Sequence, residues 1–301
     1  MGVILCEFDS HPAHDSDIVS NLRNDVFLFL HIRIFDHVLF NFVTEHLTSN
    51  NMLQQLINHK TIRRYTDAPI SEQTLNRILT AACRASNTGG MQTYSIVVTL
   101  DKEIKKQLAP AHFNQPMVTE APAVITFCVD FNRFNHWCAL RNAKPGYGNL
   151  LSLSSAIIDA CLASQNLAVA AESEGLGICY LGTTTYNARS IIKTLKLPKY
   201  VVPITTITVG YPTAEEKEKQ QEDRLPLDGI CHHEIYEDYP DSEIERIYRY
   251  KENLPQNKQF VLENKKESLA QVFTDIRYTQ QDAERISVEL LDVFREQGFQ
   301  I

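Results

Sequence analysis

The 301-residue sequence lacks the short motifs that mark several large enzyme classes. It contains no G-x-S-x-G, no H-E-x-x-H and no P-loop, so hydrolase and kinase chemistry has neither a nucleophile nor a phosphate cradle. It also has no C-x-x-C pair. Its seven cysteines are scattered singly, several of them inside apolar runs, which is typical of buried free thiols in a reducing compartment. The run Cys231-His232-His233-Glu234 fits no standard zinc spacing, so no metal is expected.

An excess of positive charge is lacking as well. The formal net charge is −8, which gives the chain no general attraction for nucleic acid or anionic membranes, and neither is expected as a partner. Any phosphate must therefore be bound by a local cluster of basic groups. The hydrophobic content of 44% and the charged content of 22% are ordinary for a globular protein with a real core.

The first 51 residues differ in composition from the rest. They contain no lysine, one glycine and one alanine, yet they hold five of the ten histidines and six of the fourteen phenylalanines. This shift near Asn50–Met52 predicts an N-terminal extension over residues 1–51, outside the fold, and a domain over residues 52–301. We expect the extension to have no role in function, with Met52 as a candidate natural start.

An apolar run at Val26–Val43 raises the alternative of a membrane tether. Arg33 and Asp36 lie in its middle, and a charge at mid-bilayer costs roughly 2.5–3.5 kcal/mol, so a span is disfavoured. A signal peptide is disfavoured too, because aspartates and no basic start precede the run. The expected location is the cytoplasm.

From Met52 onward, strand and helix patterns alternate. Apolar runs predict strands at Tyr94–Leu100, Pro122–Asp130, Gly177–Gly182 and Val201–Tyr211. The second reads as buried on both faces, and Pro203 suggests an edge or a start for the last. Helices are expected after a Ser71 cap, at Leu150–Glu174 as the most buried helix, at Asn187–Leu197, and near Ser242–Lys251, Lys265–Phe273 and Asp282–Phe299. The expected class is α+β, with one mixed central sheet flanked by helices.

Two basic segments are candidates for binding phosphate. The run His59-Lys60-Thr61-Ile62-Arg63-Arg64 offers four cationic side chains and a hydroxyl, which can hold a phosphate through charge-assisted hydrogen bonds. Arg224, in a polar loop before a proline, could complete such a clamp. From composition alone, a solvated basic turn is the favoured interpretation of the first segment and ordinary surface that of the second.

Two glycine-containing segments are candidates for binding a flat ligand. In Ser86-Asn87-Thr88-Gly89-Gly90-Met91-Gln92, small polar residues let a ligand approach the backbone, although a simple helix-stop loop is the favoured interpretation of this segment taken alone. In the run from Glu174 to Thr183, a glycine after a buried strand exposes main-chain N–H groups that can face a hydride-accepting ring atom. Neither segment is specific by itself.

In this order, the segments resemble the nitroreductase family, most of all its larger NADPH-dependent flavin reductases that contain FMN. The resemblance runs from about His59 to Leu225 and is carried mainly by HKTIR, FCVDFNR, AESEGLGICYLG and DRLP. It implies an intertwined homodimer with FMN at the interface. It also implies a ping-pong reaction in which NADPH or NADH reduces FMN, which then reduces nitroaromatics, quinones or similar small-molecule acceptors. The flavin carries the chemistry, and no catalytic acid or base of the protein is implied.

The resemblance also assigns cofactor-binding roles. His59, Lys60 and Thr61 correspond to contacts with the FMN phosphate and ribityl chain, and Arg63 to a cation near N1 and O2 of the ring. The flavin-binding loop corresponds to Ser86, Asn87 and Thr88 with Gln92 nearby, and the glutamine at the polar ring edge to Gln115. The loop whose main-chain N–H faces N5 corresponds to Tyr180, Leu181, Gly182 and Thr183, and the late phosphate-binding arginine to Arg224.

The sequence departs from the family pattern at two places. Glu222 stands where a lysine often precedes the late arginine, and Thr183-Thr184 follows Gly182 where a second glycine is common. Arg249 and Lys251 are candidates for the 2′-phosphate of NADPH. The sequence does not name the physiological acceptor. The alternatives are another flavin chemistry on this fold, dehalogenation or flavin fragmentation, and a non-enzymatic flavin-binding module.

Overall fold

The computed structural model describes residues 53–220 and 224–301. The chain divides into two compact units, residues 1–57 and Asn58–Ile301. Of the first unit only Leu53–Ile57 is described, and these five residues are helical. The predicted extension over residues 1–51, the apolar run at Val26–Val43 and Met52 lie outside the described residues, so those expectations stay predictions. The sheet and the hydrophobic core lie in the second unit.

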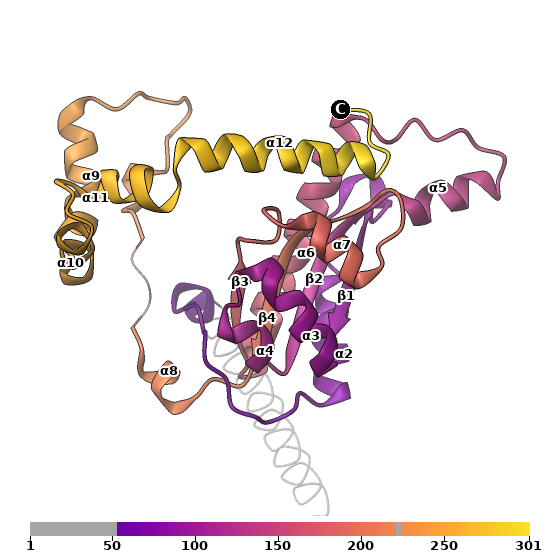
Figure 1. The fold of residues 1–301 in the computed structure, drawn as a ribbon, viewed down its shortest axis with the longest axis horizontal. Helices are drawn as coiled ribbons and strands as arrows, with labels where there is room; N and C mark the ends of the chain where they lie inside the picture. Colours follow the sequence, from indigo (N-terminus) through magenta and orange to yellow (C-terminus); the bar gives the residue numbers. More distant parts are fainter. Residues whose placement is uncertain (1–52, 221–223) are drawn as a thin grey trace, which may run out of the picture. The chain divides into compact units, whose positions relative to one another are not determined.

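Four strands form its sheet, in the order β1-β2-β4-β3 (Figure 1). They are β1 (Tyr94–Thr99), β2 (Ala123–Asp130), β3 (Gly177–Leu181) and β4 (Val201–Gly210), which confirms the four predicted strands. The expectation of a mixed sheet is wrong for the described strands, because all three pairings are antiparallel. Thr99 pairs with Val124, so the long helical connection returns the chain to the end at which it left. The strand residues themselves do not encode that return.

Pro203 lies in an inner strand, not at the edge or start that the sequence suggested. β4 pairs with β2 on one side and β3 on the other. Pro203 lies opposite Cys128, where a bulge shifts the register, and β3 pairs with β4 only as far as Thr206. One side of β4 therefore carries no ladder at Pro203, and the missing N–H breaks no pairing.

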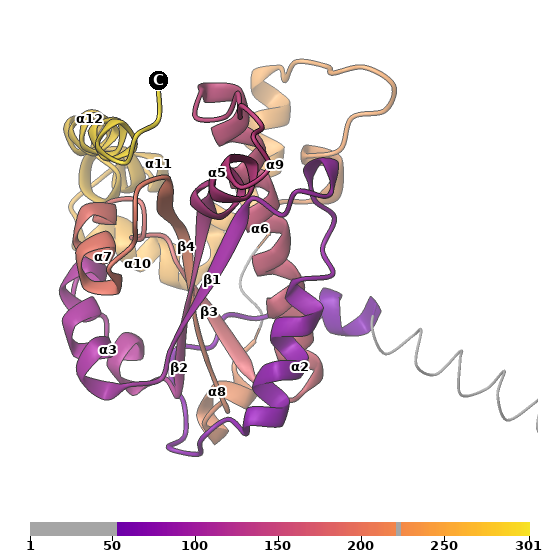
Figure 2. The same ribbon diagram turned by 90° about the vertical axis from the view of Figure 1, so that its right-hand side faces the viewer.

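Helices cover both faces of the sheet. On one face lie α2 (Glu72–Ala82) and α6 (Leu150–Ser173), and on the other α3 (Lys102–Leu108) and α7 (Ala188–Leu195) (Figure 2). Ser71 caps α2 by accepting the N–H of Thr74, as predicted. α6 buries ten residues, the most of any described helix, which confirms the prediction for it. It is also the one described helix long and apolar enough to span a membrane, but its buried small residues pack on the sheet and on α2.

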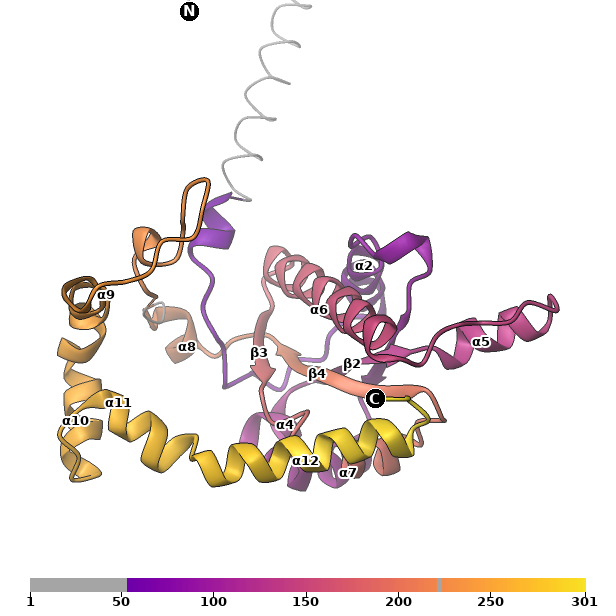
Figure 3. The ribbon, with the colours of Figure 1, turned by 90° about the horizontal axis from the view of Figure 1, so that it is seen from above.

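The remaining elements are short helices and a C-terminal helical segment. They are η1 (Thr88–Gly90), η2 (Ala109–His112), α4 (Pro116–Glu120), α5 (Asn132–Ala139), α8 (Ala214–Glu218), η3 (Leu227–Gly229), α9 (Asp241–Asn253), α10 (Pro255–Glu263), α11 (Leu269–Val272), the π-helical turn Phe273–Arg277 and α12 (Gln280–Glu296). α12 lies along α7 (Figure 3). The three predicted C-terminal helices correspond to α9, α11 and α12, whereas α10 was missed because its apolar residues follow no helical period and none is buried.

The hydrophobic core lies on both faces of β2, as its continuous apolar run predicted. Ile125 and Phe127 pack with Leu167 of α6 on one face. Val124 packs with Leu108 and Ile191 on the other. This double burial fixes β2 and β4 at the centre of the unit and leaves β3 at an edge of the described sheet.

Candidate functional site

The segment 59–65 lies against the start of β3. The N–H of Ile62 donates to the Ile178 carbonyl at 2.8 Å, and Ile62 is buried. The approach is close because residue 177 is glycine: a Cβ there would lie 2.5 Å from Cγ1 of Ile62. The Tyr65 hydroxyl donates to the Ile62 carbonyl at 2.7 Å and lies 2.8 Å from Oγ1 of Thr208 on β4. The motif that suggested a phosphate clamp is thus fixed at the edge of the sheet.

Two of the predicted phosphate-binding cations already have protein partners. Nδ1 of His59 lies 2.5 Å from Oε1 of Glu172 near the end of α6. Nζ of Lys60 donates to the carbonyls of Lys217 and Lys219, the latter at 2.9 Å. These bonds tie the segment to α6 and to the chain after α8. Lys219, one of the residues bonded by Lys60, precedes Arg224 by five positions in the sequence. The Arg224 side chain is exposed.

A buried carboxylate lies beside Arg63. Glu216 of α8 is 1% exposed, accepts the main-chain N–H of Arg63 at 3.0 Å and pairs with Lys219. Burial alone would raise the pKa of Glu216, but the hydrogen bonds from Lys219 and from the Arg63 N–H outweigh it, and the pKa falls below its usual value. The side chain of Arg63 is exposed and that of Thr61 half-buried. Arg64 pairs with Glu215 at the surface, at 3.2 Å.

The loop after β3 carries unused main-chain donors. Among the described residues, the N–H groups of Gly182 and Thr183 donate to no acceptor. The N–H and hydroxyl of Thr184 turn back to the Leu181 carbonyl, at 3.3 and 2.8 Å. The Leu181 side chain is buried, so only its main chain can face a ligand. Two free donors at the end of an edge strand suit a ligand that carries a hydrogen-bond acceptor there.

His112, which the sequence did not single out, lies beside this loop. Its Nδ1 atom is 2.9 Å from Oγ1 of Thr183, and it is fully buried. Burial lowers the pKa of His112 to about 4, so the ring is neutral at pH 7. The N–H of Gln115 donates to the His112 carbonyl at 3.1 Å, where α4 begins. The fold therefore brings the segment of Gln115 to the same end of β3 as Thr183.

The third group of predicted residues is held by α6. Asp159, 1% exposed, accepts the N–H and the hydroxyl of Thr88 at 2.9 and 3.0 Å, and the Thr93 hydroxyl at 3.3 Å. The Asn87 side chain accepts the N–H of Gln92 at 3.2 Å, which closes the loop on itself, and Ser86 is exposed. Asp159 was also missed. Its signal was visible, since it is the only charged residue between Leu150 and Ala171.

The predicted contacts fall into separate groups within one chain. Asp159 and Glu172 are thirteen residues apart on α6, about 20 Å at 1.5 Å per residue. Tyr180 lies between them, its hydroxyl 3.1 Å from Oγ of Ser164, and burial raises the pKa of that phenol to about 12. The segment 59–63 and the loop 182–184 lie at opposite ends of β3, whereas the loop 86–92 is tied to the N-terminal half of α6.

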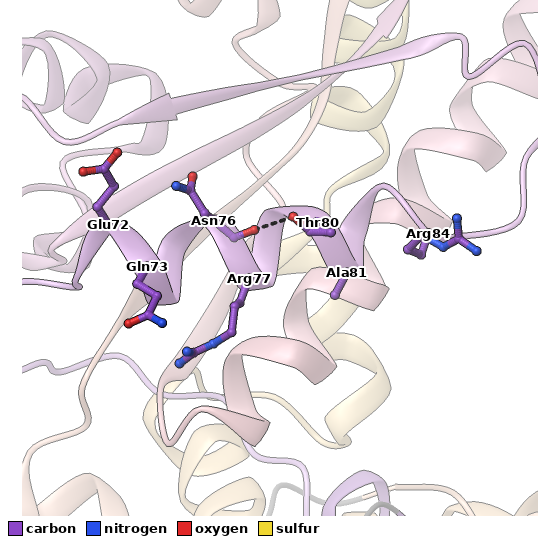
Figure 4. Close-up of a pocket in the computed structure, with 7 residues that line it drawn as sticks. All are labelled: Glu72, Gln73, Asn76, Arg77, Thr80, Ala81 and Arg84. Atoms are coloured by element: carbon purple, nitrogen blue, oxygen red, sulfur yellow. Dashed lines mark hydrogen bonds between the residues drawn. The ribbon is translucent and has the colours of Figure 1, made fainter.

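Other hollows do not coincide with these groups. A hollow of about 790 Å³ on the outer face of α2 contains no predicted site residue (Figure 4); it is lined by Glu72, Gln73, Asn76, Arg77, Thr80, Ala81 and Arg84. Lys251 lines another, of about 400 Å³, with Tyr248 and Phe273, and Arg249 lies on the same helix, α9. Within residues 53–220 and 224–301, no group of three or more His, Cys, Asp or Glu side chains could hold a metal ion.

Comparison with known proteins places these features in a family. The sequence model of the nitroreductase family matches residues 56–211, just over half of the chain. An FMN reductase [NAD(P)H] from Bacillus subtilis is 33% identical over 189 residues, which cover 62% of this chain and 75% of that protein. An oxygen-insensitive NADPH nitroreductase from Salmonella typhimurium is 32% identical over 185 residues, which cover 62% of this chain and 74% of that protein.

Solved structures give the same result. A structure from Bacteroides fragilis is 55% identical, with a TM-score of 0.80, over 82% of this chain and all of that one. A nitroreductase structure from Bacillus subtilis is 26% identical, with a TM-score of 0.72, over 82% of this chain and 98% of that one. The α+β class and the resemblance inferred from the motifs are confirmed, and the chain belongs to the nitroreductase family.

Proposed function

We propose that this protein is an FMN-containing oxidoreductase that takes a hydride from NADPH or NADH and delivers it to small acceptors such as nitroaromatics and quinones. One arrangement carries the proposal. The N–H groups of Gly182 and Thr183, which donate to no acceptor among the described residues, lie at one end of β3, and Arg63 lies at the other. Relatives named FMN reductase and NADPH nitroreductase support it.

The residues present fit FMN. Bound FMN supplies the ring atom that accepts and releases the hydride. The N–H groups of Gly182 and Thr183 would hydrogen-bond the ring at its N5 side. Arg63, fixed through its main chain by Glu216, would place positive charge where the reduced ring gathers negative charge. Because the flavin carries the chemistry and the protein only orients it and stabilises its charge, we assign no catalytic acid or base to the protein.

The remaining predicted contacts would hold the rest of the cofactor. We assign the phosphate and ribityl end to His59, Lys60, Thr61 and Arg224, with His59 and Lys60 also bracing the segment through Glu172 and the carbonyls after α8. Gln115 would touch the polar ring edge. The loop residues Ser86, Asn87, Thr88 and Gln92 would complete the site from a second copy of the chain, since they lie in a separate group.

An exposed apolar face on α6 supports the homodimer. Leu151, Ile158 and Leu162 recur at helical spacing on its outer side, and Leu151 is 78% exposed. A face of this kind on the longest described helix suits an isologous, two-fold contact with the same helix of a second copy. Such a pairing would also explain why one chain presents its flavin contacts in separate groups.

Further assignments follow from the same proposal. We assign the 2′-phosphate of NADPH to Arg249 or Lys251 on α9, where Lys251 lines a hollow with aromatic walls. We expect the protein to act in the cytoplasm, because its described cysteines are free thiols.

Steady-state kinetics test the proposed reaction. NADPH and a quinone are varied together with the FMN-loaded full chain, and a nitrofuran then replaces the quinone. Parallel double-reciprocal lines with both acceptors are expected. A flavin that NAD(P)H cannot reduce would favour the binding module. Consumption of reduced FMN with oxygen would favour flavin fragmentation, and preference for a halotyrosine would favour dehalogenation.

A further inference from the structure

The loop between β3 and α7 is held to η2 at two points. Oγ1 of Thr183 lies 2.9 Å from Nδ1 of His112, and Nδ2 of Asn187 donates to the Ala111 carbonyl at 2.8 Å. Both bonds join segments more than seventy residues apart in the sequence. Thr183 is 8% exposed and His112 0%, so water does not compete for the first bond. The conformation of the loop therefore depends on η2.

The buried position of His112 lowers the stability of the fold. Among the described residues, its Nε2 atom is buried and has no hydrogen-bond partner. A buried, unsatisfied polar atom destabilises a fold, and an aliphatic side chain of similar size would avoid that cost. Stability alone therefore does not explain a histidine at this position. Its one side-chain hydrogen bond goes to Thr183.

Thr183 stands where a second glycine commonly follows Gly182 in the family pattern. A threonine hydroxyl gives the loop an anchor that glycine lacks, and His112 supplies the partner. The next residue, Thr184, closes the turn onto the Leu181 carbonyl. With both hydroxyls committed inward, the N–H groups of Gly182 and Thr183 are left for a ligand.

We propose that His112 is a positioning residue for the cofactor-facing loop: by holding the Thr183 hydroxyl, it fixes the direction of the Gly182 and Thr183 N–H groups. The inference rests on the proposed function, because the flavin is the ligand that these donors meet. His112 itself touches no reacting atom. Its action passes through Thr183.

Paired substitutions in the full chain test this role. His112→Leu and Thr183→Val each remove one side of the bond, whereas His112→Asn and Thr183→Ser each keep a polar atom near its place. The readouts are the dissociation constant of FMN, from the fluorescence of released flavin, and the midpoint potential of the bound flavin. The first two variants are expected to weaken FMN binding about three- to tenfold and to shift the potential. The double variant His112→Leu/Thr183→Val should lose little more than either single one.

The outcomes separate this inference from the function on which it rests. Near wild-type binding by Thr183→Ser and His112→Asn supports the positioning role. A folded Thr183→Val with unchanged binding and potential would overturn it, as would additive losses in the double variant. His136→Leu, at an exposed position on α5, is the control and should change neither readout. Failure of the wild-type chain to bind FMN would instead overturn the proposed function.

Discussion

The carboxylate of Glu216 accepts the main-chain N–H of Arg63 at 3.0 Å, although the two residues are 153 positions apart in the sequence. Glu216 is buried, and Lys219 pairs with its other oxygen. α8 thus holds the segment 59–63, which carries most of the predicted contacts with the FMN phosphate, in place. The bond also fixes the main chain at Arg63.

Glu216→Gln should destabilise the fold by about 1–3 kcal/mol at pH 7, because the charge-assisted bonds become neutral ones. The pKa of Glu216 is lowered from 4.5 in the folded state. Its contribution is therefore complete above about pH 4.5 and is lost as the pH falls through the lower, folded-state pKa. Urea unfolding of both proteins across this range measures it. A difference that grows as the pH falls would contradict the assignment.

Arg63→Ala should weaken FMN binding by about tenfold or more, because a hydrogen bond to a charged group is worth about 1.5–3 kcal/mol. Reduction of the bound flavin should also slow. Arg64→Ala is the matched control: its partner Glu215 is at the surface and exposed, so little change is expected. Equal losses in both variants would point to general charge instead of a fixed cation, and full flavin occupancy in Arg63→Ala would remove Arg63 from the site.

Ile158→Asp/Leu162→Asp should shift the protein from dimer to monomer. Each apolar side chain buried in a dimer contributes about 1.5–3 kcal/mol, so the dimer should weaken at least about a hundredfold. Analytical ultracentrifugation measures this, and FMN occupancy should fall in parallel. Leu227→Asp changes an exposed leucine outside α6 and should leave the mass unchanged. A wild-type monomer that binds FMN fully would refute the shared site.

Deletion of residues 1–51 should leave FMN stoichiometry and turnover unchanged. The described members of the three core clusters all lie at Ile62 or later. The composition of the first 51 residues also differs from that of the rest. Purification of both forms and comparison of their flavin spectra and melting temperatures provide the test. A deleted form that fails to fold would show that the extension is part of the domain.

Much of the fold was predictable because local pattern and burial agree. The run at Ala123–Asp130 is apolar at almost every position and is covered on both faces. Strand direction was not predictable, since it depends on how the long connection after Thr99 returns. α10 has no apolar stripe to indicate it. Pro203 was misjudged because the bulge opposite Cys128 appears only once the register is known.

The site was predictable only in part. Ordered motifs gave the segment 59–63 and the loop after β3, which lie at the two ends of one edge strand. The carboxylates that hold the segment 59–63 were missed, and so was His112, which holds the loop after β3. Glu172 and Glu216 resemble surface acids in the sequence and acquire their roles through contacts more than a hundred residues away. Asp159 alone carried a local signal, as a single charge within an apolar helix.

The most direct test of the account is an absorbance spectrum of the purified full chain, recorded before and after NADPH is added without oxygen. The account predicts an oxidised flavin spectrum that bleaches on addition. A flavin spectrum that persists with both NADPH and NADH would contradict the proposed hydride transfer. Absence of flavin absorbance even after incubation with FMN would contradict the assignment of Arg63, Gly182 and Thr183 to a flavin site.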